Sequence, residues 1–204
     1  MAYAGTHTSG TLAQQVLPRQ GILSNKWVAD LVLVAMGSWF VALCAQISIP
    51  LPFTPVPITL QTLAVLMAGG LLGSRLGALA LMFYAFQGAI GLPFFADGRS
   101  GWEVLHGATA GYIVGFVIAA AVVGWLAERG WDRRILTMVV VMVIGNIIIF
   151  ALGVGWLAVV MGSLPEALVA GFYPFIPGGI IKIAVAAIAL PGGWQLLKQS
   201  RMKE

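Results

Sequence analysis

Apolar segments long enough to cross a lipid bilayer follow one another along most of this 204-residue chain. A membrane-spanning helix needs about 20 consecutive, mostly apolar residues. Charged residues make up only 9% of the sequence, whereas an ordinary soluble domain carries about 25%. The sequence therefore predicts an all-α, polytopic membrane protein. It excludes a soluble enzyme, a nucleic-acid-binding protein and a disordered protein.

Proline, glycine and charged residues divide the apolar sequence into six predicted spans: residues 27–49, 58–72, 76–90, 108–127, 135–161 and 178–190. The fifth is longer than one crossing needs and too short for two, so we expect one tilted helix that breaks at Gly153-Val154-Gly155. We expect three regions: a polar or interfacial N-terminal tail at residues 1–25, a six-helix membrane domain at 26–198 and a basic cytoplasmic C-terminal tail at 199–204.

The basic residues lie at the ends of the apolar segments, almost all on one side of the membrane. If the spans alternate in direction, nine of the eleven fall on the side of the N-terminus: Arg19, Lys26, Arg75, Arg129, Arg133, Arg134, Lys198, Arg201 and Lys203. Arg99 falls on the opposite side, and Lys182 lies within the sixth span. Because Lys and Arg accumulate in cytoplasmic loops, the pattern predicts that both termini face the cytoplasm.

Motifs for catalysis or metal binding are missing from the sequence. There is no G-x-x-x-x-G-K-[ST] phosphate loop, so we expect that the chain does not hydrolyse ATP itself. The two histidines, His7 and His106, lack the partners of a metal site. We therefore predict neither an enzyme nor a metal centre, and a non-transport intramembrane enzyme or scaffold stays open as an alternative.

Lys182 is the ionisable residue that the span assignment places inside the bilayer, about one turn into the sixth span. Such groups are costly and by default functional, although a lysine near a helix end can also extend to the interface. No acidic residue is an obvious partner, so a small carboxylate ligand would fit. The loops on the same side are rich in Pro, Gly and aromatic residues, at positions 50–57, 97–106 and 171–177. This composition favours loops that form a lid or a ligand pocket over loops that only make tight turns.

Small residues recur on one face of the first span, at Ala35, Ser38, Ala42 and Ala45. Such faces let helices approach closely in a membrane. This face can pack inside the bundle or against another subunit, and the sequence does not exclude a homo-oligomer.

Three segments carry a family resemblance, in this order along the chain: residues 52–95, beginning PFTPVPITLQTLAVLMAGG, residues 98–116, GRSGWEVLHGATAGYIVGF, and residues 174–182, PFIPGGIIK. Together they resemble the BioY type of S component, the substrate-binding subunit of bacterial biotin transporters of the energy-coupling factor class. The resemblance implies a multi-pass protein of the bacterial plasma membrane, surrounded by lipid, that binds biotin on the extracellular side. It also implies a transmembrane coupling subunit and two ABC-type ATPases as partners, with biotin as a transported substrate and no cofactor.

The resemblance also directs attention to residues of the binding site. In the family's last motif, an acid and a lysine three positions apart hydrogen-bond the ligand. Lys182 matches the lysine, but Gly179 stands in place of the acid. The further candidates are the loop residues Arg99, Gly101 and Trp102, then Tyr112, and finally Gln61. An amide such as Gln61 can contact the ligand or hydrogen-bond between helices, and the same two interpretations apply to Asn146.

Gly179 leaves three explanations open. Glycine has no side chain to accept hydrogen bonds from the ureido N–H groups of biotin, and losing a buried polar partner costs about 1–3 kcal/mol. Another acceptor compensates, or the ligand is a different vitamin-sized carboxylate, or this sequence is a weakened variant.

Overall fold

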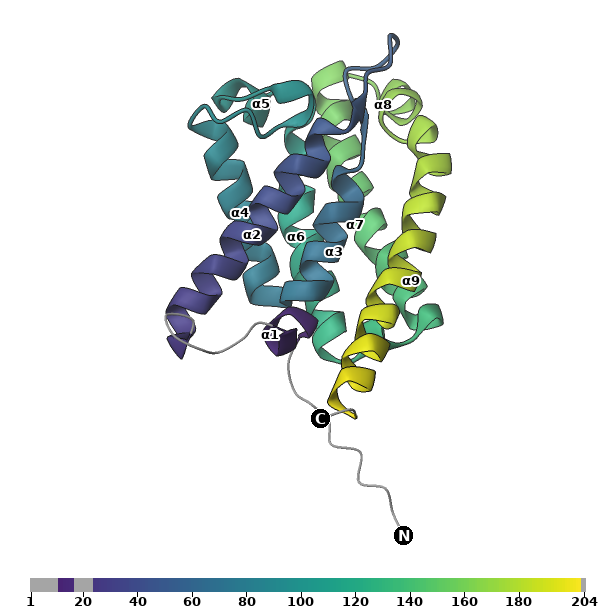
Figure 1. Ribbon diagram of the computed structural model, residues 1–204. Helices are drawn as coiled ribbons and strands as arrows, with labels where there is room; N and C mark the ends of the chain where they lie inside the picture. The colour runs from purple at the N-terminus through teal and green to yellow at the C-terminus, as the bar shows by residue number, and fades with distance from the viewer. Residues whose placement is uncertain (1–10, 17–23, 203–204) are drawn as a thin grey trace.

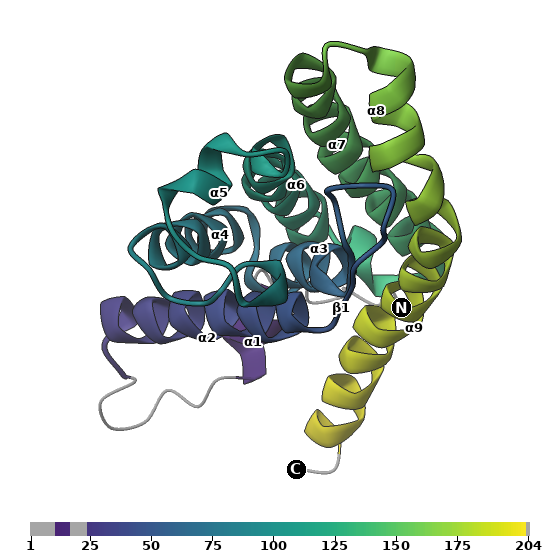
Figure 2. The same cartoon turned by 90° about the horizontal axis from the view of Figure 1, so that it is seen from above.

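The computed structural model describes residues 11–16 and 24–202 and consists mainly of helices. Six long helices alternate in direction (Figure 1): α2 (Lys26–Gln46), α3 (Gln61–Leu72), α4 (Ser74–Ala89), α6 (Ala110–Glu128), α7 (Ile135–Met161) and α9 (Ile176–Arg201). Seen from above, α3 and α6 lie in the middle of the bundle, and α2 and α9 lie on its outside (Figure 2).

Short elements occupy the connections: α1 (Leu12–Val16), η2 (Ala96–Gly98), α5 (Trp102–His106), η3 (Trp131–Arg133), α8 (Leu164–Gly171) and η4 (Tyr173–Phe175). The loop between α2 and α3 folds back on itself as a small hairpin. In it, β1 (Ser48–Ile49) pairs antiparallel with β2 (Ile58–Thr59), and Ser48 lies opposite Thr59.

Within the described residues, four helical stretches are long and apolar enough to cross a membrane: α2, α6, α7 and Leu164–Arg201, which contains α8, η4 and α9. α3 has 12 residues and α4 has 16, which correspond to about 18 and 24 Å of helix, against a hydrocarbon core of about 30 Å. These two helices meet at Gly73, whose φ of 88° suits a residue without a Cβ. The described residues are therefore mainly helical, with one helix for each predicted span and four stretches of membrane-crossing length.

Several details of the predicted helices are wrong. α2 ends at Gln46 and not at residue 49, and α3 begins at Gln61 and not at residue 58, because Ser48–Ile49 and Ile58–Thr59 pair as β1 and β2. α7 continues without a break through Gly153-Val154-Gly155 and ends at Met161. Gly153 makes room for a neighbour, because a Cβ there would lie 2.3 Å from Cδ1 of Tyr112. α9 continues through Pro191 to Arg201, beyond the predicted end at residue 190, since membrane helices tolerate internal proline.

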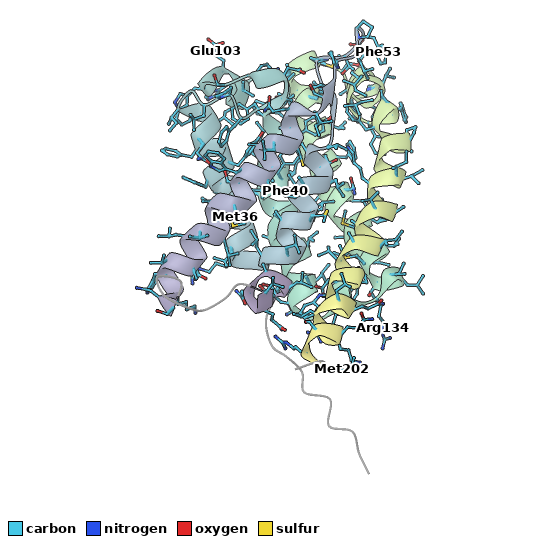
Figure 3. The ribbon with its side chains drawn as sticks, in the orientation of Figure 1. Met36, Phe40, Phe53, Glu103, Arg134 and Met202 are labelled. Atoms are coloured by element: carbon cyan, nitrogen blue, oxygen red, sulfur yellow. The ribbon has the colours of Figure 1, made fainter. Side chains whose placement is uncertain are left out.

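Apolar side chains cover the outside of the bundle. On α2, Leu31, Met36 and Leu43 are more than half exposed, and Figure 3 labels Met36 on this helix. On α9, the same holds for Ile181 and Ile188. Exposed apolar surface of this extent marks contact with lipid or with another protein.

The small-residue face of α2 packs inside the bundle. Ser38, Ala42 and Ala45 are buried, and the Ser38 hydroxyl donates a hydrogen bond to Gln87 Oε1 on α4 at 2.6 Å. Of the two interpretations of this face, the structure supports packing within the chain.

The two ends of the bundle differ in charge. Seven basic residues gather at the end where α2 begins and α9 stops: Lys26, Arg75, Arg129, Arg133, Arg134, Lys198 and Arg201. Arg134 and Met202 mark this end in Figure 3, and Glu103 and Phe53 mark the other. Arg99 lies in the connection between α4 and α6, at the end marked by Glu103. Arg19 and Lys203 lie outside the described residues.

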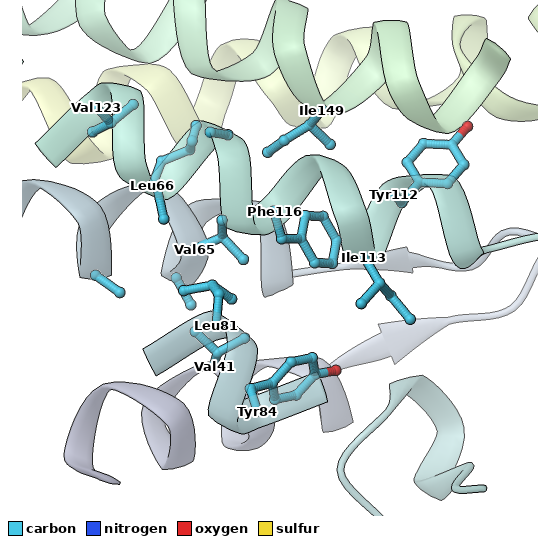
Figure 4. Packing of buried hydrophobic residues seen from close by; sticks show 14 of the residues in the cluster. Val41, Val65, Leu66, Leu81, Tyr84, Tyr112, Ile113, Phe116, Val123 and Ile149 are labelled. Atoms are coloured by element: carbon cyan, nitrogen blue, oxygen red, sulfur yellow. The ribbon is translucent and has the colours of Figure 1, made fainter. Parts of the chain in front are cut away.

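The buried core is centred on α6, which packs against α3, α4 and α7. Leu66 of α3, Phe116 and Val123 of α6 and Ile149 of α7 meet there (Figure 4). Glycine lets the backbones approach, because a Cβ on Gly69 would lie 2.6 Å from the Ala120 carbonyl oxygen. Close packing through small residues is the usual way in which membrane helices associate.

A buried carboxylate joins α9 to the turn between α6 and α7. Asp132 in η3 is 1% exposed, and its Oδ2 accepts a hydrogen bond from Trp194 Nε1 at 2.5 Å. Burial raises the pKa of Asp132, and the hydrogen bond from Trp194 opposes that rise. The folded state therefore disfavours the ionised form relative to the unfolded chain.

Replacing Asp132 with asparagine is expected to raise the melting temperature at pH 7. The amide oxygen still accepts from Trp194, and the buried charge is removed. Because the folded pKa lies above the unfolded value of about 3.9, the unsubstituted chain loses stability as the pH rises between the two values. The difference between the two proteins should therefore vanish below the unfolded pKa. Thermal unfolding in detergent across this pH range measures it.

Asp132→Ala serves as the control, since it removes both the charge and the acceptor. It should be less stable than Asp132→Asn by about 1 kcal/mol, the worth of one hydrogen bond. A melting temperature of Asp132→Asn below that of the unsubstituted chain at pH 7 would contradict the burial penalty.

Candidate small-molecule binding site

A cavity of about 670 Å³, including its opening to solvent, lies between α3, α4, α6, α7 and α9. The loop from β1 to β2 and the connection between α4 and α6 complete its wall. Its aromatic lining consists of Tyr84, Phe95, Tyr112, Phe116, Phe150 and Phe175. Its polar lining consists of Thr59, Gln61, Thr62, Arg99, Thr109, Asn146 and Lys182. Aromatic walls with a few polar groups are typical of sites for small molecules.

Lys182 lies in the wall of this cavity, in the second turn of α9, and is buried. Its Nζ donates to the Thr59 carbonyl oxygen at 2.5 Å and to Thr62 Oγ1 at 2.9 Å. The side chain thus joins α9 to the start of α3 and does not extend outward to the membrane interface. An ammonium group has three donors, so one remains for a ligand.

Gln61 and Tyr84 form a buried hydrogen-bonded pair between α3 and α4. Gln61 Nε2 donates to the Tyr84 hydroxyl at 2.6 Å, and that hydroxyl donates to the Phe94 carbonyl oxygen at 3.2 Å. Both residues line the cavity. The two interpretations of Gln61 are therefore compatible, because its NH₂ group holds two helices together while its side chain borders the cavity.

Tyr112 and Gly179 border the cavity from α6 and α9. The Tyr112 hydroxyl donates to the Gly171 carbonyl oxygen at 2.8 Å, which ties α6 to the end of α8. Apart from the adjoining residues and nearby backbone of α9, no atom lies within 4 Å of the position that a Cβ on Gly179 would occupy. The cavity therefore has unfilled space beside residue 179.

Of the three candidates in the 98–102 loop, Arg99 borders the cavity, and Gly101 and Trp102 do not. The Arg99 side chain is exposed, and its Nε donates to the Ala96 carbonyl oxygen at 3.2 Å, so it stands at the cavity mouth. Gly101 fixes the loop, since its N–H donates to the Gly88 carbonyl oxygen at 2.8 Å and its φ is 92°. Trp102 begins α5 and is 61% exposed.

The hairpin between α2 and α3 covers one side of the cavity. Val56 and Pro57 are part of the lining, and Thr54 Oγ1 donates to the Ala170 carbonyl oxygen on α8 at 2.7 Å. The base of the hairpin is held as well, because Ser48 donates to the Asp97 carboxylate. These hydrogen bonds connect the hairpin to α8 and to the connection between α4 and α6.

The sequence did not nominate most of the aromatic lining or the threonines at Lys182. Thr59 and Thr62 carry a signal, because they are polar residues spaced around Gln61 in an apolar segment. The aromatic lining residues carry no such sequence signal, because phenylalanine also occurs on exposed faces, as at Phe53 and Phe86. Which of them face the cavity depends on how the helices pack.

A helical bundle with an apolar exterior and a polar-anchored, aromatic cavity is a membrane protein that can bind a small molecule. A sequence model of the BioY family matches residues 13–199. The chain belongs to the BioY family.

Individual relatives agree with this assignment. The biotin transporter BioY of Rhizobium etli is 39% identical over 179 residues, covering 82% of this chain and 96% of that protein. The biotin transporter BioY of Thermotoga maritima is 40% identical over 156 residues, covering 76% of this chain and 86% of its own. Among solved structures, the S-component for biotin from an ECF-type ABC transporter matches with a TM-score of 0.73 at 26% identity, covering 84% of this chain and 93% of that one.

Proposed function

We propose that this chain is the substrate-binding membrane subunit for biotin uptake and that the cavity around Lys182 is the biotin site. Family membership and the biotin transporters among its relatives support the substrate. The observation that carries the site is the buried Lys182 ammonium, held by Thr59 and Thr62 at the wall of an aromatic cavity.

Biotin is a fused bicycle with a cyclic urea on one side and a carboxylate at the end of an aliphatic chain. The aromatic walls suit its apolar body, and the cavity's two cations suit its oxygens. The carboxylate is placed at Arg99, because a charged group loses least hydration at an exposed mouth. The neutral urea is placed deeper, where its carbonyl accepts from Lys182. Gly179, Gln61 and Tyr112 border the same space, and Gly101 and Trp102 shape the loop that holds Arg99.

The orientation in the membrane is part of the proposal. The chain crosses the bilayer six times, with the short helices α3 and α4 completing their crossings through the segments that flank them. Both termini face the cytoplasm, and the cavity opens to the outside. The seven basic residues gathered at one end support this arrangement. Residues 26–198 form the membrane domain, between an N-terminal tail at 1–25 and a basic tail at 199–204. The protein resides in the bacterial plasma membrane as a multi-pass subunit.

Uptake is proposed to proceed by capture from outside, closure of the 50–57 loop over the ligand and release inward after reorientation. The hydrogen bond between Thr54 and Ala170 is a contact through which this loop closes. The sequence contains no phosphate-binding loop, so the energy is assigned to a transmembrane coupling subunit and two ABC-type ATPases. The chain itself carries no enzymatic activity in this scheme.

A different vitamin-sized carboxylate is the second candidate substrate, and Gly179 favours it. Glycine offers no side-chain acceptor for the N–H groups of a cyclic urea, and the open space at that position also has room for a ligand group of another kind.

Uptake of radiolabelled biotin into a biotin-auxotrophic bacterium without its own transporter tests the proposal. Cells that express this chain together with a coupling module are expected to accumulate label. Excess unlabelled biotin should abolish the uptake, and excess of the carboxylates lipoate, pantothenate or nicotinate should not. Equal competition by another of these vitamins would transfer the assignment to that ligand. No uptake in any arm would contradict the transport function.

A further inference from the structure

The cavity is rich in hydrogen-bond donors and poor in acceptors. Its two charged side chains, Arg99 and Lys182, only donate, and none of its described lining residues is an aspartate or a glutamate. A cyclic urea brings two N–H donors of its own. Each needs an acceptor, because a buried donor left unpaired is strongly unfavourable.

Three side-chain oxygens of the lining already accept a hydrogen bond. The hydroxyls of Thr59, Thr62 and Tyr84 accept from the Gln61 backbone N–H, Lys182 Nζ and Gln61 Nε2. The hydroxyls of Thr109 and Tyr112 keep acceptor capacity, but each also carries an O–H donor. The two amide side chains, Gln61 and Asn146, offer carbonyl oxygens, which only accept. In both, the NH₂ group is engaged, and the structure gives the amide oxygen no hydrogen bond from the described residues.

Asn146 has the more unusual setting of these two amides. It lies in the middle of α7, whose 27 residues are otherwise apolar apart from Thr137 near one end and Trp156 near the other. Its Nδ2 donates to the Met142 carbonyl oxygen of the preceding turn at 2.8 Å. That bond fixes the amide, so that Oδ1 is the atom left for the cavity that Asn146 borders. A polar group at this depth is costly unless it is hydrogen-bonded.

Gly179 lies on α9, a helix that packs against α7. It offers neither an acceptor nor a side chain that would fill the space beside it. The bicycle can therefore occupy this space, between the α9 backbone and the amide on α7.

We infer that Asn146 Oδ1 accepts a hydrogen bond from one N–H of the bound cyclic urea and so selects ureido ligands over carboxylates without this group. The inference rests on the proposed biotin function. Asn146 is a specificity-determining residue in this arrangement, and it supplies from α7 the acceptor that α9 lacks at Gly179.

Equilibrium binding of biotin and of its two N-methyl analogues, each methylated at one ureido nitrogen, tests this contact. Asn146→Leu is expected to weaken biotin binding by about ten- to hundredfold. One of the two analogues lacks the N–H group from which Asn146 accepts, and Asn146→Leu should change the affinity for this analogue little. In the Asn146→Leu variant, biotin and this analogue should therefore bind with nearly equal affinity. A purely structural role of Asn146 would not produce this result.

Thr137→Val is the matched control, a polar-to-apolar change on the same helix, where the hydroxyl donates to the Trp131 and Arg134 carbonyl oxygens away from the cavity. It should leave all three affinities unchanged. Unchanged biotin binding in Asn146→Leu, or an equal loss for biotin and both analogues, would overturn the inference and leave the biotin function intact. Absence of biotin binding by the unsubstituted chain would overturn both.

Discussion

Replacing Lys182 with alanine is expected to lower the affinity for biotin by about 30-fold or more. The ammonium is buried between Thr59 and Thr62, and truncating one partner of a buried, charge-assisted contact costs about 2–5 kcal/mol. The substitution leaves the ligand's carbonyl oxygen without its donor. Equilibrium binding to the purified protein in detergent measures the loss.

Lys198→Ala is the matched control for this prediction. Lys198 lies on the same helix, in its last turn, and is exposed at the basic end of the bundle. Its removal should leave biotin binding unchanged. If Lys182→Ala bound biotin as tightly as the unsubstituted chain, Lys182 would have no part in the site.

Replacing Gly124 with alanine is expected to destabilise the bundle strongly. A Cβ at this position of α6 would lie 2.3 Å from the Gly73 carbonyl carbon and 2.4 Å from the Ser74 nitrogen. Both atoms belong to the backbone of the tight turn between α3 and α4, which cannot rotate away as a side chain can. Overpacking of this kind costs about 1–3 kcal/mol or more, so the melting temperature should fall markedly.

Gly155→Ala provides the comparison, because no atom lies within 4 Å of its Cβ position on α7. Alanine is favoured over glycine inside helices by about 1 kcal/mol, so this variant should be as stable as the parent or slightly more stable. Equal destabilisation by both substitutions would contradict the contact between α6 and the α3–α4 turn.

The arrangement of long helices follows from the sequence, because an apolar run of sufficient length has few alternatives in a membrane. The continuity of α7 through Gly153-Val154-Gly155 did not follow. A glycine can end a helix or let a neighbour pack against it, and the contact between Gly153 and Tyr112 is made only in the folded bundle. The end of α9 was also mispredicted. Pro191 interrupts the apolar sequence pattern, but the helix continues through it.

The polar part of the site was easier to predict than its apolar part. Lys182 and Gln61 stand out because polar residues in apolar segments are costly and rare. Arg99 was found together with Gly101 and Trp102, and the sequence could not separate them, because loop geometry decides which side chain reaches the cavity. The sequence left two interpretations of Asn146 open, because its free oxygen depends on the hydrogen bond to Met142, which no sequence pattern reveals.

Equilibrium binding of radiolabelled biotin to the purified, unsubstituted chain tests the central claim most directly. The cavity around Lys182 predicts saturable binding at one site per chain, displaced by unlabelled biotin and not by an equal excess of lipoate. Absence of saturable binding by a folded, monodisperse preparation, or tighter binding of another vitamin-sized carboxylate, would contradict it.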